Sequence, residues 1–297
     1  MRITNNIVLR NAVAGLADNR NAVQKLQTQI QSGSKIQAAS DDPTIAQEAM
    51  GSSSGLLAID QYTRNIDAAK SRNSTEDSAL TQVTDLLARA KELMVSQNTD
   101  TATAATRSVA SKEMEQIFNQ VVSIGNTQLS GSYVFGGDAA TTTPFLSTGT
   151  GGTLDFTSSN PTGTRSISVS AGQNLIPTHD GKQIFIDSNV LTSLRDASKA
   201  LATNDLVAGT ASMGALDGAF QKVQELLGET GARANTLDIA TQNLSALKIN
   251  LTTFRSNALD IDVEATVTAL VTKQTAYQAA MMATSKVIGM SLSDYLR

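Results

Sequence analysis

The two ends of the chain carry a matching pattern of mainly apolar positions, spaced alternately by four and three residues. Near the N-terminus the pattern runs through Leu9, Val13, Leu16, Arg20, Val23, Gln27 and Ile30. Near the C-terminus it runs through Val263, Val267, Leu270, Gln274, Tyr277, Met281, Thr284 and Ile288. This spacing is typical of a helix that packs one narrow apolar stripe against another helix. We therefore predict that the two ends are helical and meet.

The apolar members of this pattern, with Leu292 added, are called the terminal seams below. They are Leu9, Val13, Leu16, Val23, Ile30, Val263, Val267, Leu270, Tyr277, Met281, Ile288 and Leu292. One interpretation is that they form the core of an intramolecular bundle. The other is that they complete their burial against neighbouring subunits, because a helical pair this thin is marginally stable alone. Composition does not choose between the two interpretations.

Turn-forming residues mark where the N-terminal helices begin and end. The pattern predicts a helix over residues 6–32, and Gly33 suits the left-handed conformation that ends a helix. Asp42 is well placed to accept backbone N–H groups, and Pro43 fits the first position of a helix. From there a second helix is expected to run to about Ser96, followed by a third that ends near Gly125.

Residues 131–187 have a different character and are rich in Gly, Thr and Ser. Short runs alternate between apolar and polar positions, with pairs at Tyr133 and Phe135, Leu154 and Phe156, Ile167 and Val169, and Ile184 and Ile186. Alternation with a period of two, bounded by Gly and Pro, predicts β-strands. We expect a small β insertion made of several hairpins.

Helical periodicity returns after Asn189, and no proline occurs from residue 178 to the end. Asp260 and Asp262 precede the last helix, where acidic groups favour the positive end of the helix dipole. The predicted fold is mainly α with a small β domain. We expect a long antiparallel helical hairpin or coiled-coil bundle, with both termini together and the β-rich insertion at the far end.

Composition excludes several classes of protein. The 297 residues include no Cys, one His and four Pro, so neither a disulfide nor a thiolate metal site is possible. The net charge of −4 comes without a basic run, which argues against nucleic acid as a partner. No apolar stretch approaches the roughly 20 residues that span a bilayer. We also expect no cleavable secretory signal, because the start lacks an apolar core followed by a cleavage site.

Candidate catalytic groups are few, and each has a simpler explanation. Ser53 lies in Gly51-Ser52-Ser53-Ser54-Gly55, which matches the pattern around a hydrolase nucleophile, but the match lies inside a helical tract. The small residues there would more simply let two helices approach closely. His179 stands among turn formers and is expected to be exposed. Asp41 and Asp42 are explained by helix capping. We therefore predict no catalytic, cofactor or metal site.

Short segments spread along nearly the whole chain resemble the bacterial flagellin superfamily and occur in the correct order. The matching segments are 26–36, 40–43, 79–94, 131–137, 231–233, 277–280, 285–287 and 291–296. Asp41-Asp42-Pro43 and Gly131-Ser132-Tyr133-Val134-Phe135-Gly136-Gly137 are similar to the hook–filament junction proteins of that superfamily. The resemblance implies an inner coiled-coil domain from 1–42 and 259–297. It also implies a helical rod from 43–130 and 188–258, and an outer β-rich domain at 131–187.

The resemblance further implies a non-enzymatic structural adaptor that joins the hook to the filament. Its expected partners are further copies of itself in a ring, the hook-side junction protein, flagellin, and an export chaperone on the C-terminal helix. It would leave the cell uncleaved through the flagellar type III apparatus and be extracellular. A short filament flagellin is the nearest alternative. A hydrolase that uses Ser53 and His179, and a secreted coiled-coil adhesin, are the alternatives from other classes.

Overall fold

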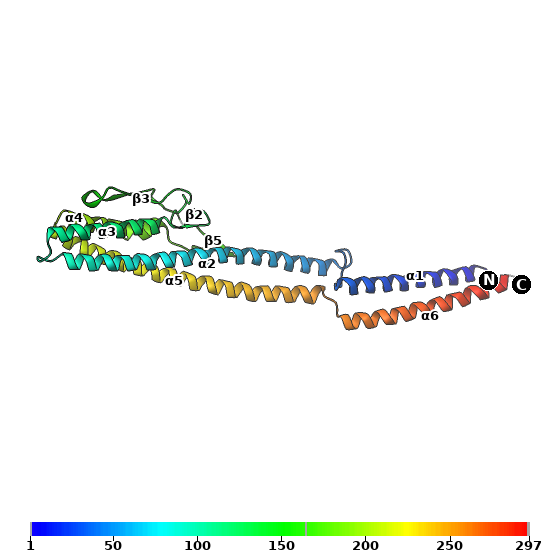
Figure 1. Cartoon of the computed structure of the whole chain (residues 1–297). Coiled ribbons are helices and arrows are strands. Elements are labelled where there is room, and N and C mark those ends of the chain that lie inside the picture. Colours follow the sequence, from blue (N-terminus) through cyan, green and yellow to red (C-terminus); the bar gives the residue numbers. More distant parts are fainter. Residues whose placement is uncertain (1, 164, 296–297) are drawn as a thin grey trace. The chain divides into compact units, whose positions relative to one another are not determined.

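The computed structural model describes the backbone of residues 2–163 and 165–295, and the side chains of residues 7, 10–163 and 165–286. Helices make up most of the fold (Figure 1). They are α1 (Arg2–Ser32), α2 (Pro43–Gln97), α3 (Ala104–Gly125), α4 (Val190–Ala202), α5 (Leu206–Leu259) and α6 (Val263–Tyr295). The prediction of a mainly α fold with a small β region is confirmed.

The chain divides into two compact units. The terminal unit consists of residues 1–58 and 246–297, and the central unit consists of Ile59–Ser245. In the terminal unit, α1 packs along α6, so the first and last helices lie side by side (Figure 1). The predicted meeting of the two ends is therefore found inside the terminal unit.

The ends of the terminal helices follow from the residues at their caps. Gly33 has a φ of +71°, the left-handed conformation that stops α1. One carboxylate oxygen of Asp42 accepts hydrogen bonds from the backbone nitrogens of Thr44 and Ile45, at 3.0 and 3.1 Å, and so caps α2. Asp262 does the same for α6 by accepting from the nitrogen of Ala265 at 3.0 Å. Both predicted acidic starts are confirmed.

The central unit contains a continuous apolar core. It is built from α2, α3, α4 and α5, with Leu80, Leu87, Met94, Met114 and Phe118 among its fully buried side chains. In Figure 1, α3 lies beside α4, and the contacts between the two helices confirm this. Two ion pairs tie α2 to α5 outside the core, Lys70 with Asp238 at 2.7 Å and Lys91 with Asp217 at 2.5 Å.

Among the residues that the structure describes, the predicted β insertion forms three antiparallel hairpins within the central unit. They pair β1 (Gln128–Leu129) with β2 (Ser132–Tyr133), β3 (Phe145–Thr148) with β4 (Asp155–Ser158), and β5 (Ile167–Ser170) with β6 (Gln173–Leu175). The helical turn η1 (Gly151–Thr153) links β3 to β4. Phe145 and Leu154 place their side chains in the core, which anchors the second hairpin on the helices.

The strand predicted around Ile184 and Ile186 was wrong. The segment forms η2 (Lys182–Asp187), a single π-helical stretch. Ile184 and Phe185 are consecutive and both fully buried, which a strand with one buried face does not allow because its side chains alternate. The ring of Phe185 meets Phe135 and Phe145 edge to face, with centroids 5.4 and 5.1 Å apart. Core packing on both sides therefore overrides the local alternation.

Candidate assembly interface on the terminal helices

The α1–α6 contact uses part of the terminal seams. Leu16, Val23 and Ile30 on α1, and Leu270 and Tyr277 on α6, are half-buried. Ala12, Asn19 and Leu26 of α1 are also half-buried. Together with Leu16, Val23 and Ile30 they form a series spaced alternately by four and three residues. The regular spacing shows that α1 presents one stripe to α6 in the manner of a coiled coil.

Other seam residues stay exposed. Val13, Val263, Val267 and Met281 each have between 41% and 58% of their surface in solvent. Val263, Val267 and Val271 follow one another by four and form an exposed row on α6. Leu9, Ile288 and Leu292 lie outside the residues whose side chains the structure describes. The terminal helices thus bury one stripe within the chain and leave a second apolar surface open.

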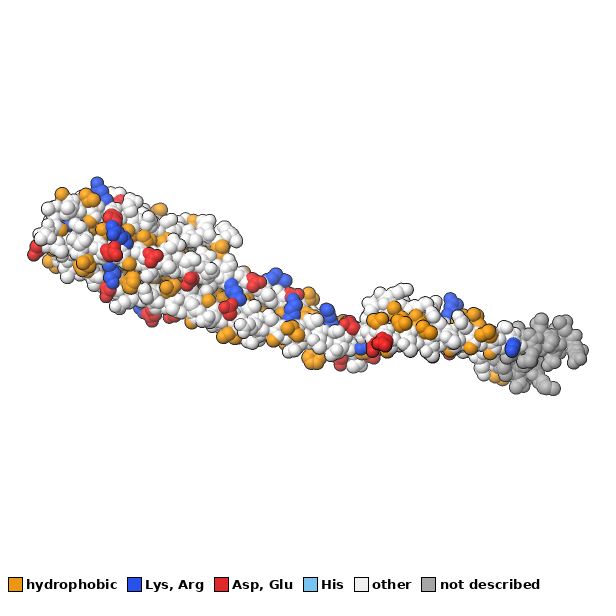
Figure 2. Space-filling view, turned by 60° about the horizontal axis from the view of Figure 1, so that its bottom comes forward, with side chains coloured by type: hydrophobic (Ala, Val, Ile, Leu, Met, Phe, Trp, Pro, Cys, Tyr) orange, Lys and Arg blue, Asp and Glu red, His pale blue; other side chains and the backbone are white. Residues whose placement is uncertain are grey.

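The terminal unit buries almost nothing large. Among its described residues, only Ala46 and Ala49 are buried apolar side chains. Its exposed large apolar side chains are Ile7, Val13, Met50, Leu57, Leu247, Ile249, Phe254, Val263, Val267, Val271, Met281 and Met282. Figure 2 shows apolar side chains along the described part of this unit. An exposed apolar surface of this extent marks an interaction site.

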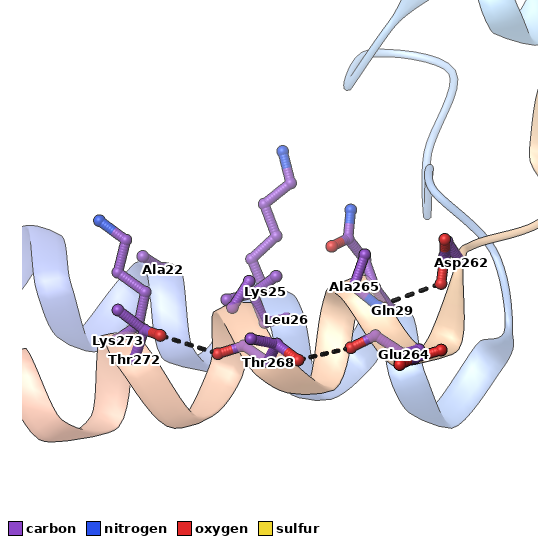
Figure 3. Close-up of a pocket in the computed structure, with 11 residues that line it drawn as sticks. Ala22, Lys25, Leu26, Gln29, Asp262, Glu264, Ala265, Thr268, Thr272 and Lys273 are labelled. Carbon is purple, nitrogen blue, oxygen red and sulfur yellow. Dashed lines mark hydrogen bonds between the residues drawn. The ribbon is translucent and has the colours of Figure 1, made fainter.

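A groove of about 930 Å³ runs between α1 and α6 (Figure 3). Small or apolar residues line much of it, namely Ala22, Leu26, Ala265 and Ala269. The hydroxyls of Thr268 and Thr272 donate hydrogen bonds to the carbonyls of their own helix four residues earlier, at 2.9 Å each. The donor hydrogens of both hydroxyls are therefore already used within α6. Such a lining suits the apolar face of another helix.

Charged side chains stand around this groove. Lys25 and Lys273 extend on the same side of the helix pair in Figure 3. Asp262 and Glu264 line the end of the groove at the start of α6. Charges of opposite sign at separate places would fix the direction and register of a helix that docks between them.

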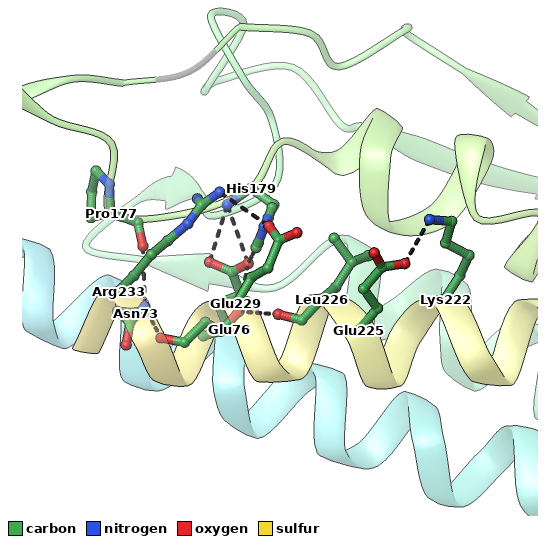
Figure 4. A network of polar contacts seen from close by, with 10 residues as sticks. Asn73, Glu76, Pro177, His179, Lys222, Glu225, Leu226, Glu229 and Arg233 are labelled. Carbon is green, nitrogen blue, oxygen red and sulfur yellow. Dashed lines mark hydrogen bonds and ion pairs between the residues drawn. The ribbon is translucent and has the colours of Figure 1, made fainter. Parts of the chain in front are cut away.

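The structure does not support a catalytic role for Ser53 and His179. Ser53 lies inside α2, where the neighbouring Gly55 brings α2 close to α5: a Cβ on Gly55 would lie 2.8 Å from Cδ1 of Leu251. His179 is buried, so its predicted exposure was wrong, and both ring nitrogens face the carboxylates of Glu76 and Glu229 (Figure 4). Neither nitrogen is left to activate a serine, which argues against the hydrolase alternative.

Within the described part of the chain, no group of three or more His, Asp or Glu residues is arranged to hold a metal ion. No helix in that part is both apolar and long enough to cross a membrane.

Two family models match the chain. The N-terminal helical region of bacterial flagellin matches residues 3–140, and the C-terminal helical region matches residues 213–296. Together the two matches cover well over half of the sequence, and they include all of the seams on α1 and α6. The chain belongs to the bacterial flagellin family.

Individual relatives of this flagellin-family chain cover most of its length. The flagellar hook-associated protein 3 of Escherichia coli is 25% identical over 98% of both chains. The flagellin of Bacillus subtilis is 28% identical over 89% of this chain and 88% of its own. A solved structure of a putative flagellar hook-associated protein from Vibrio parahaemolyticus covers 74% of this chain and 100% of its own, with a TM-score of 0.66 and 20% identity. That likeness supports the fold.

The packing of α1 on α6 includes a residue that the seam pattern did not contain. Leu26 lies half-buried beside the groove, whereas the pattern placed Gln27 in the stripe. Two different stripes with the same alternating spacing of four and three residues can be drawn on α1, and both contain Leu16, Val23 and Ile30. One stripe also contains Leu26, and the other contains Gln27. Because leucine is apolar and glutamine is polar, the sequence itself favours the stripe with Leu26 for the contact between α1 and α6.

Proposed function

We propose that the protein is a non-catalytic structural component of the bacterial flagellum, an adaptor that joins the hook to the flagellin filament. The terminal unit supports this proposal, because its described residues expose a long series of large apolar side chains and bury almost none. Such a surface gains its stabilisation when neighbouring subunits cover it. The near-complete coverage of hook-associated protein 3 and the motif at residues 131–137 support the adaptor over other members of the family.

The partners follow from the same surface. Further copies of the chain would form a ring, with the hook-side junction protein on one side and flagellin on the other. We propose that the terminal seams are buried in this ring and that the groove between α1 and α6 receives a helix of a neighbour. The proposed domains are 1–42 with 259–297 as the inner coiled coil, 43–130 with 188–258 as the rod, and 131–187 as the outer β-rich domain.

Export completes the proposal. The chain would leave the cell uncleaved through the flagellar type III apparatus, with a chaperone bound to α6 beforehand. The exposed row of Val263, Val267 and Val271 gives such a chaperone an apolar surface to cover. Co-purification of the full chain from the cytoplasm, compared with a chain that lacks 260–297, tests this step. Recovery of the same chaperone with both chains would contradict it.

Removal of the terminal helices tests the adaptor role. A chain without residues 1–32 or without 260–297 is expected to keep a folded central unit and to lose incorporation into the flagellum. The measurement is motility and filament growth in a strain that lacks the full protein. Restored filament growth by either truncated chain would contradict the proposal.

A short filament flagellin is the second candidate, because the flagellin of Bacillus subtilis is 28% identical over most of the chain. The purified protein separates the two functions. A flagellin is expected to polymerise when seeded with filament fragments, whereas an adaptor is not. Immunogold labelling of intact flagella gives a second measurement, since an adaptor labels only the boundary between hook and filament and a flagellin labels its length.

A further inference from the structure

His179, the single histidine of the chain, lies buried between two carboxylates in the central unit (Figure 4). Its Nδ1 is 2.5 Å from Oε1 of Glu76 on α2, and its Nε2 is 2.8 Å from Oε2 of Glu229 on α5. The side chain of Glu76 is 0% exposed, and that of Glu229 is 53% exposed. The imidazole ring therefore bridges two helices through its two nitrogens.

When both carboxylates are ionised, both contacts require a charged ring. A neutral imidazole has one donor and one acceptor nitrogen, and an ionised carboxylate can only accept. Only the imidazolium form donates from both nitrogens, so it alone satisfies Glu76 and Glu229 together. The two carboxylates stand at opposite nitrogens of the ring, which prevents them from chelating one metal ion with it.

Glu76 and Asn73 of α2 also hold the backbone of the segment 176–181, which connects β6 to η2. The two carboxylate oxygens of Glu76 each lie 3.2 Å from the backbone nitrogen of His179, which donates to them. Asn73 donates from Nδ2 to the backbone oxygen of Pro177 at 3.1 Å and to that of Thr230 at 3.2 Å. Two residues of α2 therefore fix the segment at two points, and Glu229 of α5 adds a third.

We propose that His179 is a protonation-dependent latch that fastens the segment 176–181 to α2 and α5 and releases it as the pH rises. Deprotonation would turn a lone pair of the ring toward one of the carboxylates and replace an attraction with a repulsion. It would also remove the positive charge that faces the buried carboxyl group of Glu76, and a buried carboxylate without such a partner is costly in a protein interior. The segment leads directly into Ile184 and Phe185, so its release would loosen the core residues that follow it.

The charged groups around the ring determine whether the pKa of His179 is raised or lowered. In the part of the chain that the structure describes, Glu76 from α2 and Glu229 and Arg233 from α5 face it. Burial and the nearby Arg233 would lower the pKa of His179, but hydrogen bonds with Glu76 and Glu229 outweigh them and hold that pKa above its ordinary value of 6.5. The same hydrogen bond lowers the pKa of Glu229 below 4.5.

The two shifts define a pH window. The stability that His179 contributes is fully present below 6.5 and is lost as the pH rises through its pKa in the folded chain. The stability that Glu229 contributes is present above 4.5 and is lost as the pH falls through its own folded pKa. The latch is therefore strongest between these limits and opens on the alkaline side.

NMR titration of the imidazole in the full chain tests the charge state, and a single histidine gives a single signal. We expect a midpoint above 6.5 in the wild type. Glu229→Gln keeps a hydrogen-bond acceptor but removes the charge, so its midpoint should lie below that of the wild type. Glu225→Gln is the matched control, because Glu225 is exposed on the same helix and pairs with Lys222 at 2.6 Å. A wild-type midpoint at or below 6.5, or equal midpoints in the two variants, would overturn the proposal.

Amide hydrogen exchange tests the release of the segment. Between about pH 6 and about pH 9, we expect the protection factor of the His179 amide to fall roughly tenfold or more in the wild type, the scale of a lost charge-assisted hydrogen bond. In His179→Gln the protection should be low and independent of pH. If that variant does not fold, Glu229→Gln replaces it and should show the fall at lower pH than Glu225→Gln does. Wild-type protection that is the same at both pH values would overturn the proposal.

Discussion

Lys35 donates a hydrogen bond from Nζ to the backbone oxygen of Asn257 at 2.7 Å, across 222 positions of sequence. The backbone nitrogen of Lys35 donates to the oxygen of Leu259 at 2.6 Å, and the nitrogen of Ile261 donates to the oxygen of Gly33 at 3.1 Å. These bonds join the link after α1 to the last turn of α5 and to the link before α6. They align the two terminal helices at one end, independently of the apolar stripe between them.

Loss of the Lys35 side chain should weaken this joint. Lys35→Met removes one hydrogen bond from a charged donor, and we expect a cost of about 1 kcal/mol because the site is partly exposed to water. Faster amide exchange at Ile261 is the measurement. Lys25→Met, on the exposed side of α1, is the control and should leave that rate unchanged. Equal exchange at Ile261 in both variants would show that Lys35 does not contribute.

A charge placed in the seam should prevent assembly without unfolding the central unit. Leu16→Glu and Leu270→Glu each put a carboxylate into the half-buried stripe between α1 and α6. We expect loss of incorporation into flagella, with the thermal transition of the central unit retained. Val95→Glu, at an exposed apolar position of the central unit, is the matched control and should be incorporated normally. Normal incorporation of both seam variants would refute the role of the seam.

Two glycines of α2 should respond differently to the same substitution. A Cβ at Gly55 would lie 2.8 Å from Leu251, whereas nothing lies within 4 Å of one at Gly51. Gly51→Leu should stabilise the helix by up to about 1 kcal/mol, because leucine is the better helix former. Gly55→Leu should destabilise the chain by about 1–3 kcal/mol through overpacking against α5. Comparison of the two melting temperatures decides the point, and equal shifts would contradict it.

The aromatic contacts of η2 should dominate the stability of the β region. Phe185→Ala removes a fully buried ring that meets Phe135 and Phe145, and we expect a cost of about 3–5 kcal/mol. Leu146→Ala, at a position 61% exposed on the adjacent β3, should change stability by about 0.5 kcal/mol or less. Denaturant unfolding of both variants gives the comparison. A similar cost for the two would show that η2 is not part of the core.

Local chemistry made the helices predictable. The caps at Gly33, Asp42 and Asp262 depend on residues within four positions of each helix end, so the sequence shows them directly. The hairpins were predictable in the same way, from alternation bounded by Gly and Pro. Membership of the family came from short segments in the correct order along the whole chain.

Long-range packing limited the prediction elsewhere. The turn formers around His179 favour exposure, but its partners Glu76 and Glu229 stand 103 and 50 positions away, and no local pattern indicates them. The alternation at Ile184 and Ile186 indicates a strand only if Phe185 points to solvent, and the surrounding phenylalanines bury it. On α1, spacing alone could not distinguish the stripe with Leu26 from the stripe with Gln27.

The sparse burial in the terminal unit has a consequence for the fate of individual copies. A subunit that has not been incorporated keeps its terminal helices accessible to proteases, since little free energy holds them closed. In the ring proposed above, a subunit would be covered and resistant. Surplus or misplaced copies would then be degraded selectively, and the cell would need no separate label to distinguish them from working ones.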